Sequence, residues 1–199
     1  MTKTTLRVLM FVAVGLMIGG SFSLLGSETV VSTQQEIPKE YLAPTRVVVQ
    51  IPEHNEPVNV YSDEIPLSQG WQAYTQDTCR RYGVDYSLML GLMETESSFR
   101  FDADSGWAVG ICQIGYINEE WLAEEGIDIY SKMGNIEAGC MILSDFLSRH
   151  SVSEALVCYN CGEYGAQELF DDGITETEYS RTVQAAAERW AEKIKEAQK

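Results

Sequence analysis

The distribution of proline divides this chain more sharply than any other feature of its sequence. All five prolines lie between positions 38 and 66, and none occurs in residues 67–199. Proline breaks the interior of a helix, so its absence allows long helices in the second part of the chain. Residues 27–66 have the composition of an extended linker. We therefore expect one domain in residues 67–199, which are enough for a single hydrophobic core.

The pattern of apolar residues after position 66 is helical, with no sustained two-residue alternation. Helices are expected at residues 67–83, 86–97, 118–126, 135–150, 151–162 and 177–199. Suitable capping residues stand at Asp85, Asn118 and Ser151, and Ser151 forms a capping-box pattern with Glu154. The domain is therefore expected to be mainly α.

The first 26 residues differ in character from the rest of the chain. Lys3 and Arg7 precede an uncharged apolar run from Val8 to Leu25. A positive flank before such a run is typical of an export signal or a membrane anchor. We favour an uncleaved anchor with its basic end in the cytoplasm, and a cleaved signal is the alternative. In both cases the remainder of the chain is expected outside the cytoplasm.

The charge of the chain excludes one class of partner. It has 30 acidic residues against 14 Lys and Arg, which gives a net charge of −16. An acidic surface repels the phosphate backbone of nucleic acids, so nucleic-acid binding is not expected. The same charge favours solubility without indicating any particular partner.

Two glutamates, Glu94 and Glu96, lie near the end of the second expected helix. Glu96 shares a helical face with Met89, Leu92 and Met93, whereas Glu94 points elsewhere. A carboxyl group on a partly apolar face has a raised pKa, which suits a general acid near neutral pH. On periodicity alone, a helix-end glutamate that is bonded to a nearby donor is the simpler interpretation.

Four short segments give Glu96 a wider context. They are "ESSF" at 96–99, "AVGICQ" at 108–113, "NIEAG" at 135–139 and "CYNCG" at 158–162. A tyrosine, Tyr179, follows them near the start of the last expected helix. In this order and spacing the segments resemble the lysozyme-like catalytic domain of lytic transglycosylases, over about residues 68–190.

The resemblance implies a mainly α, lysozyme-like fold of the goose or SLT type, without metal or cofactor. It implies cleavage of the β-1,4 bond between N-acetylmuramic acid and N-acetylglucosamine in peptidoglycan glycan strands. Glu96 would protonate the glycosidic oxygen and then act as base on the muramyl 6-hydroxyl, which closes a 1,6-anhydro ring. The implied substrate-binding residues are Ser97, Gln113, Tyr159, Asn160 and Tyr179.

On this basis residues 1–26 are a signal peptide or anchor, residues 27–66 a linker and residues 67–199 the transglycosylase domain. A membrane-tethered domain fits local opening of the cell wall for a secretion or conjugation machinery. Wall turnover and phage entry require the same chemistry. The sequence does not choose among these settings.

One stretch departs from the family pattern. Between Phe99 and Gly110 the chain reads "RFDADSGWAV", which brings Asp102 and Asp104 near Glu96 in sequence. If either carboxylate held a water opposite Glu96, the product would be a hydrolysed end; the simpler interpretation is a solvated acidic turn. A hydrolytic muramidase on the same fold is therefore one alternative, and a non-catalytic glycan-binding or assembly protein is another.

The cysteines suggest a second kind of chemistry. Their number, five, is odd for an exported chain, and Cys158 and Cys161 form a C-x-x-C motif. Such a motif occurs in redox and metal sites. The family commonly has alanine at both positions, and cysteine as a small buried apolar residue explains them without new chemistry, which is the interpretation we favour. A disulfide and a metal site stay open as alternatives.

Overall fold

The computed structural model of the chain describes residues 60–198, so the predicted anchor or signal and most of the predicted linker lie outside the described residues. The elements are α1 (Gln69–Tyr82), α2 (Tyr86–Ser97), β1 (Ala108–Val109), β2 (Ile114–Gly115), η1 (Tyr116–Asn118), α3 (Glu119–Glu124), α4 (Lys132–Leu147), α5 (Val152–Asp171) and α6 (Glu178–Ala197). The prediction of a mainly α domain is confirmed. Within the described part of the chain, no helix is both long and apolar enough to cross a membrane.

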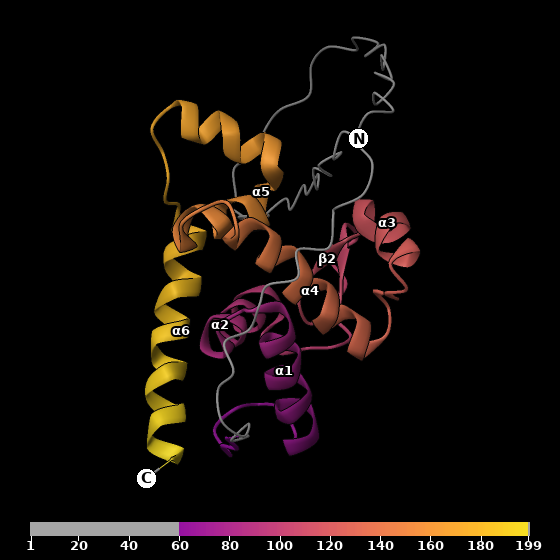
Figure 1. Cartoon of the computed structure of the whole chain (residues 1–199), viewed down its shortest axis with the longest axis vertical. Helices are drawn as coiled ribbons and strands as arrows, with labels where there is room; N and C mark the ends of the chain where they lie inside the picture. Colours follow the sequence, from indigo (N-terminus) through magenta and orange to yellow (C-terminus); the bar gives the residue numbers. More distant parts are fainter. Residues whose placement is uncertain (1–59, 199) are drawn as a thin grey trace, which may run out of the picture.

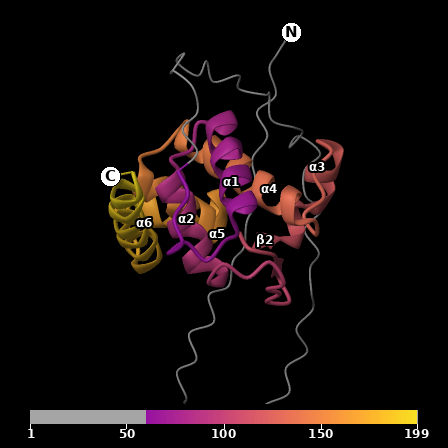
Figure 2. The ribbon, with the colours of Figure 1, turned by 90° about the horizontal axis from the view of Figure 1, so that it is seen from below.

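α2 is a buried helix that packs against α6 and α1. Figure 1 shows α6 along one side of the domain and α3 near the opposite side, with α1, α2 and α4 between them, and Figure 2 shows the same order from below. Met89, Leu90, Leu92 and Met93 of α2 have no exposed surface. β1 and β2 form a small antiparallel pair in which Ala108 lies opposite Gly115. Strands of two residues are too short for periodicity to reveal them.

Most of the expected helix ends are confirmed. α1 ends at Gly83, whose φ of 67° lies in the left-handed region that favours glycine. α2 begins at Asp85, whose carboxylate accepts the Leu88 N–H at 2.9 Å. The capping box of Ser151 and Glu154 is also present.

The start of α4 and the capping of α3 differ from the prediction. α4 begins at Lys132 rather than Asn135, because the Ser131 hydroxyl caps it by accepting the Gly134 N–H at 2.9 Å. Asn118 precedes α3 but makes no capping hydrogen bond. Its side-chain oxygen instead accepts the Trp121 indole N–H at 3.1 Å.

The last residues of the predicted linker are part of the packed domain. The Gln76 side chain accepts the Val60 N–H at 2.9 Å and donates to the Val60 carbonyl at 2.8 Å. Gln72 makes the same pair of bonds to Ser62, at 3.1 and 2.9 Å. Because α1 holds residues 60–66 in this way, the fold starts before the boundary that the proline distribution indicated.

α6 packs closely against α2 at Gly91. A Cβ atom added there would lie 2.6 Å from the Val183 carbonyl oxygen and 2.7 Å from the Ala187 nitrogen. Both are backbone atoms of α6, which cannot move aside as a flexible side chain can. Glycine at this position therefore sets the distance between the two helices.

Glu94 fixes the same pair of helices by polar contacts. Its carboxylate accepts from the Arg189 guanidinium at 2.8 Å and from the Trp190 indole N–H at 2.7 Å, both on α6. The Trp190 ring also meets Phe99 edge-on, with ring centroids 5.5 Å apart. The first of the two glutamates thus has a structural role, and Phe99 of the "ESSF" segment completes the contact.

We expect Gly91→Ala to lower the free energy of unfolding by about 2 kcal/mol, because an overpacked helix contact displaces backbone. Urea unfolding followed by circular dichroism measures the change. Gly70→Ala in α1 is the matched control, since a Cβ atom there meets nothing within 4 Å. Equal free energies of unfolding for the two variants would show that the packing of α6 on α2 does not require glycine at position 91.

Candidate active site

Glu96 lies in the last turn of α2, on the face that periodicity predicted to be buried. The side chains of Met89, Leu92 and Met93 on that face are fully buried, and Glu96 at its end is half-buried. The Tyr179 hydroxyl, in the first turn of α6, donates a hydrogen bond to Glu96 Oε1. The packing of α6 on α2 therefore brings together two residues that are 83 positions apart.

Burial of the Glu96 carboxyl raises its pKa from 4.5 to about 7, and the hydrogen bond from Tyr179 opposes this rise. Desolvation disfavours the charged form, and the donor favours it. Among the described residues, no second carboxylate contributes to the shift. Near neutral pH Glu96 is thus present in both protonation states, as a group that donates and later accepts a proton requires.

The groups around Glu96 are themselves uncharged. Burial, with the nearby Glu96 carboxylate as the next cause, raises the pKa of the Tyr179 hydroxyl well above its ordinary value. The same two causes raise the pKa of the Cys112 thiol. Both side chains therefore stay protonated, and Tyr179 acts as a hydrogen-bond donor throughout the physiological pH range.

The loop that follows β1 is held in place by one side chain of α4. Asn135 Nδ2 donates to the carbonyls of Val109 and Ile129, each at 2.9 Å, and Oδ1 accepts the Cys112 N–H at 2.9 Å. Gly110, with φ of 81°, packs so closely that a Cβ atom there would lie 2.3 Å from Asn135 Nδ2. These contacts explain why the "AVGICQ" and "NIEAG" segments occur together. Asn135 was not among the predicted site residues, because spacing within a motif does not show which loop its side chain reaches.

The far end of the "NIEAG" segment meets the same loop. A Cβ atom at Gly139 would lie 2.9 Å from Cys112 Sγ and 3.0 Å from Met89 Cε. Glycine on α4 therefore makes room for the Cys112 side chain against the centre of α2. The loop of residues 110–113 is thus held between α2 and α4, and we call it the clamped loop.

Ser97 joins the end of α2 to this loop. Its hydroxyl donates to the Ile111 carbonyl at 2.8 Å and accepts the Arg100 N–H at 3.1 Å. The Ser97 side chain therefore holds the loop close to the end of α2, where Glu96 lies. Its contact with substrate stays a prediction.

Gln113 is turned into the protein. Its side chain is 6% exposed, and Nε2 donates to the carbonyls of Gly110, at 2.9 Å, and Ala103, at 3.3 Å. Both of these hydrogen bonds use Nε2, and neither uses Oε1. The amide thus stabilises the loop through its donor.

Tyr159 and Asn160 lie at the end of the first segment of α5. Tyr159 is fully buried, and its hydroxyl donates to the Cys112 carbonyl at 2.9 Å, so it supports the loop from within the core. Asn160 is half-buried, and its buried Nδ2 has no partner in the described structure. Gly162 then interrupts α5 with φ of 75° and ψ of 163°, a conformation nearly restricted to glycine. The helix continues beyond this break to Asp171, which the sequence did not predict.

Backbone strain is concentrated around the same site. In the part of the chain that the structure describes, the non-glycine residues with positive φ are Ser98, Phe99 and Gln113. Two of them directly follow the Glu96–Ser97 pair, and the third ends the clamped loop. Such conformations persist only where surrounding contacts enforce them, and they cluster at functional sites.

The carboxylates that allowed a hydrolytic alternative are exposed. Asp104 Oδ1 accepts the Gly106 N–H at 2.7 Å, and this bond, together with the Tyr116 hydroxyl, holds the pKa of Asp104 below its ordinary value. Asp102 is likewise at the surface. The arrangement is that of a solvated turn, the simpler of the two interpretations.

The C-x-x-C motif forms no disulfide bond in the structure. All five thiols are free, and Cys161 Sγ donates to the Val157 carbonyl at 3.1 Å. Burial raises the pKa of the Cys158 thiol to about 12, which makes it a poor nucleophile. Among residues 60–198 no three His, Cys, Asp or Glu side chains are grouped so that they could hold a metal ion.

Two surface hollows lie away from this constellation. One, of about 310 Å³, is lined by residues at the starts of α1 and α4, including Trp71 and Met133. The other, of about 270 Å³, lies between α3 and the segment that follows it. Glu96 lines neither of these two hollows. We therefore define the candidate site by the polar contacts of Glu96 and by the strained backbone beside it.

We expect Tyr179→Phe to raise the pKa of Glu96 further, because the donor that stabilises the carboxylate is lost while burial is kept. Carbon-13 NMR of glutamate-labelled protein follows the titration of this carboxyl directly. Tyr164→Phe is the control, since Tyr164 is 66% exposed. A fall in the pKa of Glu96 in the Tyr179 variant would contradict the assigned hydrogen bond.

A second prediction concerns stability. Below pH 4.5 Glu96 is protonated in both the folded and unfolded chain, so Glu96→Gln changes little there. Above pH 7 the wild type must keep a carboxylate in a poorly hydrated position, whereas glutamine avoids this cost. We expect the variant to gain on the order of 3 kcal/mol at about pH 8, measured by urea unfolding. A gain that is independent of pH, or equal to that of Glu188→Gln at the surface, would refute it.

Comparison with known proteins agrees with the arrangement of these segments. The model of the transglycosylase SLT domain family matches residues 73–172, about half of the chain and nearly all of α1 to α5. No curated protein matches the chain. Because the family match contains Glu96, the clamped loop and the "CYNCG" segment, the helical domain described above is lysozyme-like, and the chain belongs to the transglycosylase SLT domain family.

Proposed function

We propose that this protein is a lytic transglycosylase that cleaves the β-1,4 bond between N-acetylmuramic acid and N-acetylglucosamine. The observation that carries the proposal is the state of Glu96, whose pKa of about 7 results from burial and is opposed by Tyr179. A carboxyl group in this state can give and take a proton near neutral pH. Membership of the SLT family supplies the glycan substrate class.

In the first step, protonated Glu96 donates its proton to the glycosidic oxygen. The bond between that oxygen and C1 of the muramyl ring breaks, and positive charge develops on the ring. Glu96 becomes a carboxylate, which the Tyr179 hydroxyl stabilises by the hydrogen bond already present. The raised pKa makes the donation favourable at neutral pH.

In the second step, the Glu96 carboxylate accepts the proton of the muramyl 6-hydroxyl. The 6-oxygen attacks C1, and the product ends in a 1,6-anhydro ring. Glu96 is protonated again, so the cycle closes without water. Ordinary glycoside hydrolysis uses two carboxyl groups, whereas this route requires one because the substrate carries its own nucleophile.

The neighbouring residues divide into two groups under this proposal. Asn160 Nδ2 is buried and Gln113 is 6% exposed, so the contact of these two amides with hydroxyl or acetamido groups of the glycan, which the resemblance implies, stays a prediction. Ser97 and Tyr159 position the loop between Gly110 and Gln113 through the carbonyls of Ile111 and Cys112. Tyr179 orients Glu96.

Hydrolysis on the same fold is less well supported. It requires a second carboxylate that holds a water, and Asp104 is instead engaged by Gly106 and Tyr116. A non-catalytic glycan-binding or assembly role does not account for the raised pKa of Glu96. We therefore retain transglycosylase activity as the function.

The location that we propose for the enzyme rests on the sequence of residues outside the described part of the chain. We propose that residues 1–26 anchor it or direct its export, and that residues 27–59 form a spacer to the domain outside the cytoplasm. Such a tether limits the reach of the site to nearby wall, which suits a secretion or conjugation machinery. Detergent dependence and N-terminal sequencing of the isolated protein decide between anchor and signal.

We expect Glu96→Gln to lower the release of muropeptides from purified peptidoglycan by about 10³-fold, the scale of general acid–base catalysis. Products are identified by mass spectrometry, because an anhydro end weighs one water less than a hydrolysed end. Retention of glycan binding by the variant, measured by wall pull-down, shows that the fold is intact. Undiminished release would defeat the assignment of Glu96.

Asp104→Asn and Asp102→Asn serve as controls for the alternative mechanism. Both are expected to release anhydro products at the wild-type rate, since neither carboxylate takes part in the proposed steps. Hydrolysed ends from the wild type, lost in either variant, would establish the hydrolase instead.

A further inference from the structure

We propose that Cys79 and Cys140 form a disulfide bond that joins α1 to α4 in the mature protein. The two Sγ atoms lie 3.9 Å apart, and both residues are buried, with 1% and 0% of their surface exposed. The proposal rests on the extracytoplasmic location given above, because disulfides persist in oxidising compartments. It is otherwise independent of the catalytic assignment.

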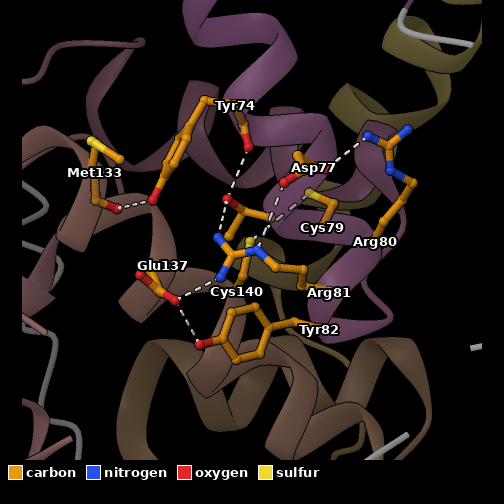
Figure 3. A network of polar contacts seen from close by, with 10 residues as sticks. Tyr74, Asp77, Cys79, Arg80, Arg81, Tyr82, Met133, Glu137 and Cys140 are labelled. Carbon is orange, nitrogen blue, oxygen red and sulfur yellow. Dashed lines mark hydrogen bonds and ion pairs between the residues drawn. The ribbon is translucent and has the colours of Figure 1, made fainter. Parts of the chain in front are cut away.

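The geometry of the interface favours this pair. Figure 3 shows the two side chains directed toward each other from facing helices. A disulfide has a sulfur–sulfur distance of about 2.05 Å, so the atoms must approach by about 2 Å in total. Rotation of two side chains and a small shift of the helices can share this movement.

Polar contacts on both sides of Cys79 along α1 join this helix to α4. On one side the Tyr74 hydroxyl donates to the Met133 carbonyl at 3.3 Å. On the other, Arg81 and the Tyr82 hydroxyl both donate to Glu137 Oε1, at 2.9 and 3.0 Å, as Figure 3 shows. The cysteines therefore face each other in a preformed arrangement rather than by a chance approach.

The sequence had drawn attention to a different pair. Cys158 and Cys161 stand in a C-x-x-C motif, yet Cys161 Sγ is directed to the Val157 carbonyl within its own helix. Cys79 and Cys140 are 61 residues apart and belong to no motif. Only the packing of α1 on α4 brings them together.

The bond forms by thiol–disulfide exchange with a disulfide donor, either a protein or a small molecule such as oxidised glutathione. The two cysteine thiols lose two protons and two electrons and become one disulfide, while the donor is reduced to two thiols. In the folded chain, contact with Cys140 and burial raise the pKa of the Cys79 thiol well above its ordinary value. Exchange is therefore expected while α1 docks on α4, and the finished bond is shielded from reductants.

The bond closes a loop that contains α2, the clamped loop and Glu96. Linking two positions so far apart restricts the unfolded chain strongly. We expect the melting temperature of the oxidised protein to exceed that of the reduced protein on the order of 10 °C. The linkage would hold the scaffold of the site without touching its chemistry.

The test uses the full chain, isolated in detergent from a bacterial host that exports it, with thiols alkylated in denaturant at lysis. We expect alkylation of Cys112, Cys158 and Cys161, and a non-reducing peptide map in which the Cys79 peptide is linked to the Cys140 peptide. Alkylation of both Cys79 and Cys140 would overturn the proposal. A bond from either of them to another cysteine would do the same.

Two double variants and one activity assay complete the design. Cys158→Ala with Cys161→Ala should keep the cross-link and the drop in melting temperature on reduction, whereas Cys79→Ala with Cys140→Ala should lose both. Release of anhydro muropeptides by the same samples tests the proposed function separately. Glu96→Gln should abolish that release and retain the cross-link, so failure of one proposal is distinguished from failure of the other.

Discussion

Close packing of α6 against α2 is the constraint on which the site depends. Glu96 is on α2 and Tyr179 is on α6, and they meet because the backbones approach at a glycine. Glu94, two residues before the candidate acid, holds the same helices through Arg189 and Trp190. The two glutamates thus have different roles. Glu94 holds α6 in place, and Glu96 accepts a hydrogen bond from a residue of α6.

The sequence was informative wherever a local rule acts. Helical periodicity placed Glu96 on the buried face, and capping chemistry placed the helix ends at Gly83, Asp85 and Ser151. Boundaries were less predictable where the deciding contact is not periodic. α4 begins earlier because Ser131 caps it, and the domain begins earlier because glutamines of α1 bind the backbone at Val60 and Ser62.

The candidate site was predictable as a set of residues but not as a division of roles. The resemblance named Gln113, Tyr159 and Asn160 without showing that Tyr159 is enclosed in the core while Asn160 keeps an unpartnered donor. The sequence placed Asn135 only at the start of an expected helix. In the structure its side chain makes three hydrogen bonds to the backbone around the loop. Roles of this kind depend on side-chain direction across segments that are distant in the sequence, which spacing alone does not encode.

In a chain this acidic, the raised pKa of Glu96 could have two causes, the surrounding negative charge or burial. A net charge of −16 attracts protons and so favours protonation of carboxyl groups. Between exposed carboxylates, however, this effect is screened by salt over about 10 Å. Glu96 differs because its hydration is removed, and burial heads the causes of its raised pKa. Surface charge can therefore vary without changing the site, whereas any change that admits water between α2 and α6 would lower the pKa and remove the proton that the proposed first step requires.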